Sequence, residues 1–168
     1  MPIVLIPARY GSTRLPGKPL LEVKSGVPLI QLVYENAAKC GFETVVVTDD
    51  LRIEAAVKKI SGNVCRIDDD VPSGSERIAL AYQRYFKDAD LIINVQGDEP
   101  LIDPASIKLL AQKHLESSFD IMTMIKPQKN NLTDFHDKNK VKAVWNNLNG
   151  ECFYFSRAAI PCPRDEVS

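Results

Sequence analysis

An apolar segment followed directly by a basic, glycine-containing loop opens the chain and restricts its possible folds more than any other stretch. Residues 3–6, Ile-Val-Leu-Ile, are typical of a buried parallel strand. The loop of residues 7–18 then brings two glycines, two hydroxyl side chains and three cations. Glycine lets backbone amides approach a ligand that a Cβ would block, and arginine grips phosphate oxygens in a fork. The pattern predicts an α/β protein that binds a polyphosphate.

The spacing within this loop excludes two common nucleotide-binding motifs. In a Walker A loop, four residues separate the first glycine from the Gly-Lys pair. Here five residues separate Gly11 from Gly17. Pro19 follows Lys18 and has no hydroxyl to offer to magnesium. The glycine pattern of dinucleotide-binding folds is also absent. The alternative is a surface loop with solvated cations; three cations directly after the first strand favour the ligand site.

Strand-like and helix-like segments alternate along most of the chain. We expect strands at 3–6, 44–48, 64–67, 91–95 and 120–125, helices at 28–39, 51–60, 72–86 and 103–116, and a hairpin of strands 141–145 and 152–155. This alternation predicts a Rossmann-like, doubly wound, mostly parallel sheet, in one domain over residues 1–168 with a C-terminal hairpin. Ligands of such sheets bind beyond the carboxyl ends of the strands. The loops after the first and fourth strands are therefore expected to form one site.

Residues 6–20, Ile-Pro-Ala-Arg-Tyr-Gly-Ser-Thr-Arg-Leu-Pro-Gly-Lys-Pro-Leu, resemble the N-terminal loop of the sugar-acid cytidylyltransferases. The part Arg-Leu-Pro-Gly-Lys-Pro-Leu is similar to the branch of this family that uses 3-deoxy-manno-octulosonate (KDO). The sialate branch usually has Asn where this chain has Pro19. Further matches extend the resemblance to about residue 165.

The resemblance implies a site built from three stretches. In the family, the first loop holds the phosphates, a Ser-Gly-x-Glu-Arg stretch holds the cytosine, and Gln-Gly-Asp-Glu-Pro supplies a Mg²⁺ ligand. The implied nucleotide-binding residues are Pro7, Ala8, Arg9, Gly11, Ser12, Thr13, Arg14, Lys18, Ser73, Gly74, Arg77 and Asp98. The implied catalytic residues are Arg14, Lys18 and Asp98, and Asp98 is also the implied metal ligand.

Residue chemistry agrees with these roles but leaves structural alternatives open. Magnesium bound by a triphosphate takes one or two protein carboxylates, which one aspartate at a strand end satisfies. Asp98 as a turn or cap residue is the alternative. Ser73 and Glu76 have the spacing of a capping box, and this structural role is compatible with base binding.

The resemblance also implies a sugar site and a reaction. Gln96 faces the sugar in the family, and Arg157 of Tyr-Phe-Ser-Arg meets the sugar-acid carboxylate. The implied activity is transfer of CMP from CTP to the anomeric hydroxyl of KDO, for lipopolysaccharide biosynthesis, with Mg²⁺ as cofactor. The alternatives are a CTP-binding module with little turnover and a sibling enzyme such as an acylneuraminate cytidylyltransferase.

The family continues beyond residue 168. Its last third carries a second magnesium aspartate, a sugar-contacting histidine and much of the contact of its homodimer. We therefore expect residues 1–168 alone to bind Mg–CTP weakly and to release almost no pyrophosphate.

Composition excludes several other classes. Lys and Arg number 21 against 22 Asp and Glu, and this balance predicts no nucleic-acid partner. Two histidines and four cysteines without a C-x-x-C pair give no zinc-site spacing. No apolar run is long enough to span a bilayer and no signal peptide precedes the first strand, so we expect a cytoplasmic protein without a membrane partner.

Overall fold

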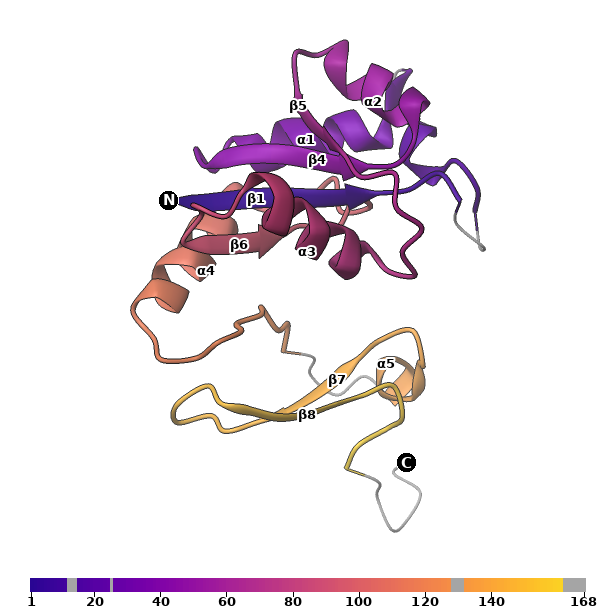
Figure 1. Ribbon diagram of the computed structural model, residues 1–168. Helices are drawn as coiled ribbons and strands as arrows, with labels where there is room; N and C mark the ends of the chain where they lie inside the picture. The colour runs from indigo at the N-terminus through magenta and orange to yellow at the C-terminus, as the bar shows by residue number, and fades with distance from the viewer. Residues whose placement is uncertain (12–14, 25, 128–131, 162–168) are drawn as a thin grey trace. The chain divides into compact units, whose positions relative to one another are not determined.

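Four parallel strands form the central sheet of residues 1–122, in the order β5–β4–β1–β6 (Figure 1). The computed structural model describes residues 1–11, 15–24, 26–127 and 132–161. The four strands are β5 (Asn63–Arg66), β4 (Glu43–Thr48), β1 (Pro2–Ala8) and β6 (Leu91–Asn94). Strand β1 pairs in parallel with both β4 and β6. The predicted parallel sheet is therefore confirmed, and its first and fourth predicted strands are neighbours.

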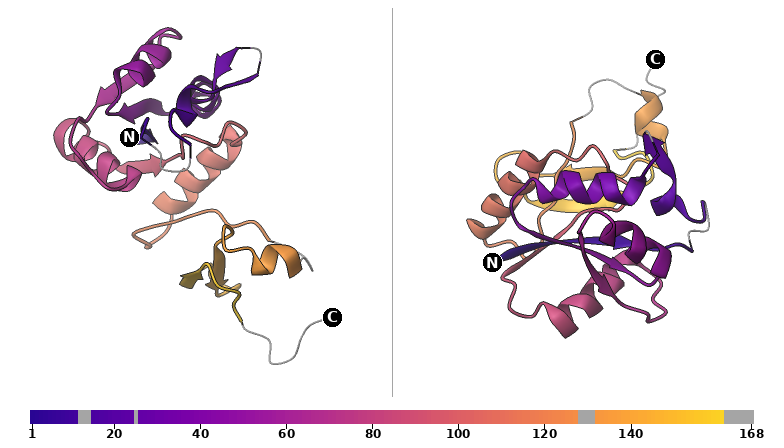
Figure 2. Two further views of the ribbon diagram at one scale, coloured as in Figure 1. Left: turned by 90° about the vertical axis from the view of Figure 1, so that its right-hand side faces the viewer. Right: turned by 90° about the horizontal axis from the view of Figure 1, so that it is seen from above.

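Helices cover both faces of this sheet. Helices α1 (Leu29–Ala38), α2 (Leu51–Lys58) and α4 (Pro104–Leu115) contribute to the buried cluster on one face. Helix α3 (Gly74–Tyr85) contributes to the cluster on the other. In the right-hand view of Figure 2, α1 and α4 lie on one side of β1 and α3 lies on the other. Successive side chains of a strand point to opposite faces of the sheet. Helices cover both faces here, so β1 is apolar along its whole length.

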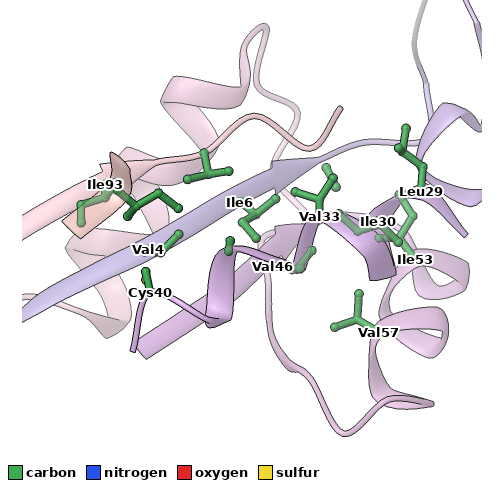
Figure 3. Packing of buried hydrophobic residues seen from close by; sticks show 14 of the residues in the cluster. Val4, Ile6, Leu29, Ile30, Val33, Cys40, Val46, Ile53, Val57 and Ile93 are labelled. Carbon is green, nitrogen blue, oxygen red and sulfur yellow. The ribbon is translucent and has the colours of Figure 1, made fainter. Parts of the chain in front are cut away.

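The larger of the two buried clusters packs side chains of β1 against α1 and both neighbouring strands (Figure 3). Val4 and Ile6 of β1 are fully buried in it, together with Ile30 and Val33 of α1. Burial of each such side chain contributes about 1.5–3 kcal/mol. This packing fixes the position of β1, and with it the start of the basic loop.

Three helices begin at side-chain caps, and the one at Ser73 was predicted from its capping-box spacing. Asp50 accepts a hydrogen bond from the Arg52 amide at α2, and Ser73 accepts one from the Glu76 amide at α3. At α4, Asp103 accepts hydrogen bonds from two amides. These caps satisfy amides that have no partner within the helix. They also fix where the polar residues before each helix lie.

The segment between the basic loop and α1 forms short elements. The 3₁₀ turn η1 (Lys18–Leu20) precedes an antiparallel pair, β2 (Glu22–Lys24) and β3 (Val27–Pro28). Helix α1 begins at Leu29, one residue later than predicted, because Pro28 belongs to β3 with an extended backbone.

Chain contacts divide the protein into two compact units, Met1–Met122 and Thr123–Ser168, which we describe separately. The second unit holds α5 (Leu132–His136) and an antiparallel hairpin of β7 (Lys142–Trp145) and β8 (Cys152–Ser156). The predicted C-terminal hairpin is confirmed. A single domain over the whole chain stays a prediction. Within the described ranges, no helix combines the length and apolar character that crossing a membrane demands.

The predicted fifth strand at 120–125 is wrong. These residues have no regular structure, and β1 is the only strand paired with β6 among the described residues. Ile121 is 87% exposed, and Met124 and Ile125 are exposed as well. An apolar stretch becomes a strand through pairing and burial, and this one has neither. Composition alone therefore predicted a strand at 120–125 that the sheet does not contain.

Candidate nucleotide site

Three loops of the first unit meet at Pro7, near the carboxyl end of β1. A Cβ added to Gly97, in the loop after β6, would lie 2.8 Å from the Pro7 carbonyl oxygen. A Cβ added to Gly74, at the start of α3, would lie 3.1 Å from the Pro7 ring. The approach at Gly97 is closer than a side chain allows, so glycine is required there. The loop after β6 and the start of α3 therefore converge on the strand that feeds the basic loop.

The basic loop and the loop after β6 are joined by an ion pair. The Lys18 ammonium lies 2.6 Å from Oδ2 of Asp98. Both side chains remain half exposed, at 41% and 50%. The ion pair places the lysine and the carboxylate of the two predicted ligand loops within reach of one ligand. Gly11, earlier in the basic loop, borders open space, since nothing lies within 4 Å of an added Cβ.

Arg9 connects the basic loop to the segment before α3. Its guanidinium donates a hydrogen bond to the Pro72 carbonyl at 3.3 Å. The next residue, Ser73, caps α3: its hydroxyl accepts from the Glu76 amide, which is one half of a capping box, and also donates to the Glu76 carboxylate, each at 3.2 Å. The structural role predicted for Ser73 is present, and the residue stays partly exposed beside Arg9 and Pro7.

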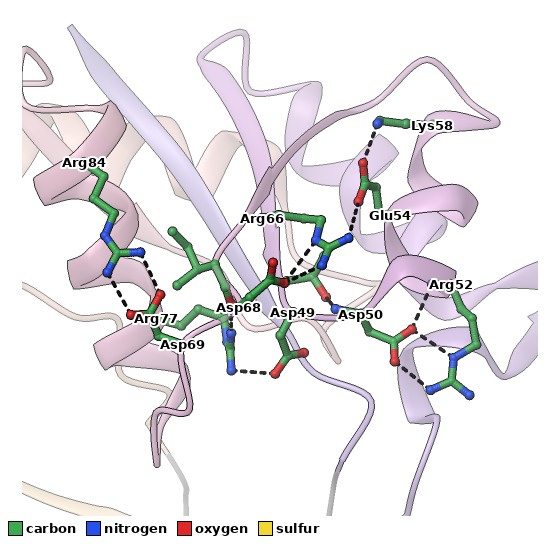
Figure 4. Close-up of polar contacts among 12 residues, drawn as sticks. Asp49, Asp50, Arg52, Glu54, Lys58, Arg66, Asp68, Asp69, Arg77 and Arg84 are labelled. Carbon is green, nitrogen blue, oxygen red and sulfur yellow. Dashed lines mark hydrogen bonds and ion pairs between the residues drawn. The ribbon is translucent and has the colours of Figure 1, made fainter.

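Arg77, the third residue implied for base binding, has a buried guanidinium. The residue is 3% exposed, and its two terminal nitrogens donate to the Ile67 carbonyl and to Oδ2 of Asp49, the latter at 2.7 Å (Figure 4). Arg77, Ile78 and Ala81 are the buried residues of α3, so helical spacing could have signalled that Arg77 faces inward. Arg77 ties α3 to the segments that follow β4 and β5.

The two residues implied for sugar binding lie in different units. Gln96 follows β6, is exposed, and donates a hydrogen bond to the Asn94 side chain at 3.1 Å. Arg157 follows β8 in the second unit, where it donates to the Lys138 carbonyl at 3.0 Å. The remaining implied nucleotide-binding residues lie in or near the basic loop. Ala8, at the end of β1, is buried. Ser12, Thr13 and Arg14 lie outside the described residues.

Asp98 is suited to a metal ion that brings most of its own ligands. Among the described residues, no group of three or more His, Cys, Asp or Glu side chains could hold a metal. Asp98 offers one half-exposed carboxylate, with Lys18 as its partner. Mg²⁺ requires six oxygen ligands and often takes only one or two from protein carboxylates, with phosphates and water supplying the rest. The donor set therefore fits a metal–nucleotide complex and does not fit an ion held by the described residues alone.

Comparisons with known proteins show the family of this chain. A family profile described as Cytidylyltransferase matches residues 3–168. The 3-deoxy-manno-octulosonate cytidylyltransferase of Aliivibrio fischeri (strain MJ11) is 46% identical over 164 residues, which cover 96% of this chain and 65% of that protein. The enzyme of the same name from Photobacterium profundum is 44% identical over 167 residues, 98% of this chain and 66% of that protein. The chain thus spans slightly less than two thirds of the length of these curated relatives.

Solved structures of cytidylyltransferases are similar to this chain as well. The structure of CMP:2-keto-3-deoxy-manno-octonic acid synthetase complexed with CTP superposes with a TM-score of 0.82 at 35% identity, covering 98% of this chain and 67% of that one. A cytidylyltransferase from Leptospira borgpetersenii superposes with a TM-score of 0.59 at 30% identity, covering 70% of this chain and 50% of that one. The profile match over nearly the whole chain, together with these relatives, shows that the chain belongs to the cytidylyltransferase family.

Proposed function

We propose that the chain carries the CTP site of an enzyme that transfers CMP from CTP to the anomeric hydroxyl of KDO, giving CMP-KDO and diphosphate. The observation that carries the proposal is the 2.6 Å pair of Lys18 and Asp98, which sets a cation and a carboxylate at adjacent strand ends. The names of the relatives, 3-deoxy-manno-octulosonate cytidylyltransferase, support both the nucleotide and the sugar acid.

The reaction is a displacement at the α-phosphorus of CTP. The sugar hydroxyl oxygen forms a bond to this phosphorus, the bond from phosphorus to the bridging oxygen breaks, and diphosphate leaves with the electron pair. The hydroxyl proton passes to solvent. Catalysis of this kind depends on positioning and on neutralising charge. Lys18 and Arg14 supply positive charge to the phosphates, assisted by the backbone of Ser12 and Thr13, and Arg9 helps to organise the loop through its bond to Pro72.

Asp98 is the residue that would hold Mg²⁺. When bound there, the ion would neutralise phosphate charge and acidify the attacking hydroxyl. Lys18 is already the partner of this carboxylate, so both groups exchange their mutual contact for contacts with the nucleotide complex.

The positions of the loops in the first unit support the assignment of the base-binding groups. Ser73 and Gly74 lie beside Pro7 and Arg9 and present backbone and hydroxyl groups to the cytosine. Arg77 contributes by holding this helix start in place, since its guanidinium is engaged with Asp49 and Ile67. The sequence resemblance alone assigns Gln96 and Arg157 to the sugar acid; the guanidinium fork of Arg157 suits its carboxylate.

The test is pyrophosphate release from CTP, measured for this chain and for the full-length protein that contains it. KDO, sialate and glucose 1-phosphate serve as acceptors, and ATP replaces CTP in a parallel series. From residues 1–168 alone we expect almost no release. From the full-length protein we expect release with CTP and KDO, lost in Lys18→Ala and kept in Lys113→Ala, whose lysine forms a comparable exposed ion pair with Glu116. Release with sialate or glucose 1-phosphate but not KDO would contradict the sugar assignment. Equal binding of ATP and CTP would contradict the base assignment.

A homodimer and a location in the cytoplasm complete the proposal. Phe153 and Phe155, which share one face of β8, are 63% and 50% exposed, and this supports an assembly in which another chain covers them. Sedimentation of the full-length protein tests the dimer. Fractionation of the source cells tests the location.

A further inference from the structure

A cation lies on an aromatic ring at the start of the basic loop. The guanidinium carbon of Arg52, in the first turn of α2, is 3.4 Å from the ring centroid of Tyr10. Tyr10 follows β1 by two residues and packs against the larger buried cluster. An arginine at this distance from a ring face is attracted by the ring quadrupole and by stacking. The contact links α2 to the basic loop across 42 positions of sequence, from residue 10 to residue 52.

Asp50 fixes the edge of the same guanidinium. Nε and Nη2 of Arg52 donate to the two carboxylate oxygens of Asp50 at 3.0 and 2.6 Å (Figure 4). Asp50 also accepts the Arg52 amide at 2.9 Å and so caps α2. The hydrogen bonds from the Arg52 side chain hold the pKa of Asp50 below its usual range. Because its edge is hydrogen-bonded to the Asp50 carboxylate, the planar Arg52 guanidinium has little freedom to move away from the Tyr10 ring.

Tyr10 in turn closes the basic loop at Gly17. The Gly17 amide donates to the Tyr10 carbonyl at 2.9 Å. Gly17 has a φ of 73°, and a Cβ added there would lie 3.0 Å from the edge of the Tyr10 ring. Only glycine combines this backbone conformation with this approach. Lys18, the partner of Asp98, is the next residue, so the position of Gly17 sets where the lysine begins.

We propose that Tyr10 and Arg52 are positioning residues that hold Gly17, and therefore Lys18, in place for the nucleotide. We call Tyr10, Gly17, Asp50 and Arg52 the loop clamp. The inference rests on the proposed function, because Lys18 is taken to bind CTP. Arg52 acts through the ring of Tyr10 and the closure at Gly17, not through contact with the ligand.

Arg66, the last residue of β5, provides a matched comparison. It also donates Nε and Nη2 to an aspartate two residues away, Asp68, at 3.1 and 2.6 Å. Its guanidinium forms a further ion pair with Glu54. Among the described residues, Arg52 is the one arginine recorded over an aromatic ring. Arg66→Ala therefore removes the same kind of ion pair and leaves the loop clamp intact.

The first measurement follows the loop without nucleotide. Amide hydrogen exchange of Gly17, read by NMR, reports opening of its bond to Tyr10. We expect exchange about two- to fivefold faster in Arg52→Ala, the range that corresponds to a cation–π contact at an exposed site. Tyr10→Leu should have the same effect, whereas Tyr10→Phe and Arg66→Ala should match the wild type. If exchange of the Gly17 amide is unchanged in Arg52→Ala, the positioning role of the loop clamp is refuted, independently of which ligand the protein binds.

The second measurement is the Kd for CTP with Mg²⁺, by calorimetry on the same variants. Arg52→Ala should weaken binding measurably, and by at most the factor seen in exchange, since affinity falls with the fraction of the binding-competent state. The double variant of Tyr10→Leu and Arg52→Ala should resemble each single variant, because both remove one contact. Weaker binding without faster Gly17 exchange would make Arg52 a direct ligand and overturn the inference, as would faster exchange with unchanged affinity. No CTP binding by the wild type would instead refute the proposed function.

Discussion

Lys18 and Asp98 form an ion pair of 2.6 Å across 80 residues of sequence, between the loop after β1 and the loop after β6. Both side chains are about half exposed. A pair of this kind typically contributes about 0–1 kcal/mol to stability. The pair is therefore suited to exchange its partners for a ligand with little effect on the fold, and the first two predictions separate its two members.

Lys18→Ala should lower transition-state stabilisation in the full-length enzyme by about 2–4 kcal/mol, the scale for one preorganised donor. Its free energy of unfolding should change by less than about 1 kcal/mol, because the ion pair is exposed. The readouts are kcat/KM for CTP and urea unfolding, with Lys113→Ala as the control. A loss of activity that follows a loss of stability in parallel would assign Lys18 a structural role. Arg14→Ala is expected to behave like Lys18→Ala on the sequence pattern alone.

Asp98→Asn should remove the dependence of CTP binding on Mg²⁺. The amide keeps the size of the side chain but offers the cation no charge, so binding with and without the ion should become alike. Calorimetry at matched ionic strength gives both affinities. Asp68→Asn, which changes another exposed, ion-paired aspartate, is the control. A variant of Asp98 that keeps the full Mg²⁺ dependence would place the metal elsewhere.

Gly97→Ala should damage the site by displacing the loop after β6. The added Cβ would lie 2.8 Å from the Pro7 carbonyl, and a carbonyl in β1 has little room to move. We expect a loss of about 1–3 kcal/mol in unfolding free energy, the scale for overpacking, together with weaker CTP binding. Gly11→Ala meets nothing within 4 Å and should keep wild-type stability. Equal stability of the two variants would show that the loop relaxes freely.

Arg77→Ala should destabilise the protein more than Arg84→Ala on the same helix. Arg77 is 3% exposed and donates to Ile67 and Asp49, whereas Arg84 pairs with Asp69 in solvent at 43% side-chain exposure. Loss of hydrogen bonds to a charged group corresponds to about 2–3 kcal/mol at Arg77, against about 0–1 kcal/mol for the exposed pair. Denaturant unfolding of both variants measures the difference. A larger loss at Arg84 would refute the role of Arg77 as an anchor of α3.

Asp103 should make stability sensitive to acid. Hydrogen bonds from the Ser106 hydroxyl and from the Ala105 and Ser106 amides lower the pKa of this carboxyl in the folded state. A lowered folded pKa stabilises the fold above the unfolded pKa of about 3.9, and this contribution is lost as pH falls through the folded value. The difference in unfolding free energy between wild type and Asp103→Asn should therefore shrink as pH falls below about 4. A difference independent of pH would contradict this assignment.

Much of the frame of this site follows from local sequence signals. The apolar run of β1, the caps at Asp50, Ser73 and Asp103, and the pattern of alternating segments predicted the sheet and the neighbouring loops. These features depend on residues close together in sequence, or on the general rule that ligands bind at carboxyl ends of strands. The commonest strand order of doubly wound sheets, in which the first and fourth strands are neighbours, correctly made the loops after β1 and β6 neighbours.

Features set by long-range packing were not predicted. The segment at 120–125 has strand-like composition, yet strands need a partner, and pairing is not encoded in composition. The burial of Arg77 depends on Asp49 and Ile67, which come from two other segments. The contact of Arg52 with Tyr10 likewise requires α2 to lie beside the basic loop.

Pro7 decides where two central strands part. The Leu5 carbonyl accepts the Val95 amide, so every second residue of β1 turns its polar groups toward β6. Pro7 is the next residue in that series, and it has no N–H to continue the ladder. Its carbonyl faces Gly97 instead of a strand partner. The hydrogen bonding between β1 and β6 therefore stops before the end of β1. An amino acid with a backbone N–H at position 7 would offer β6 a donor, and the pairing could continue.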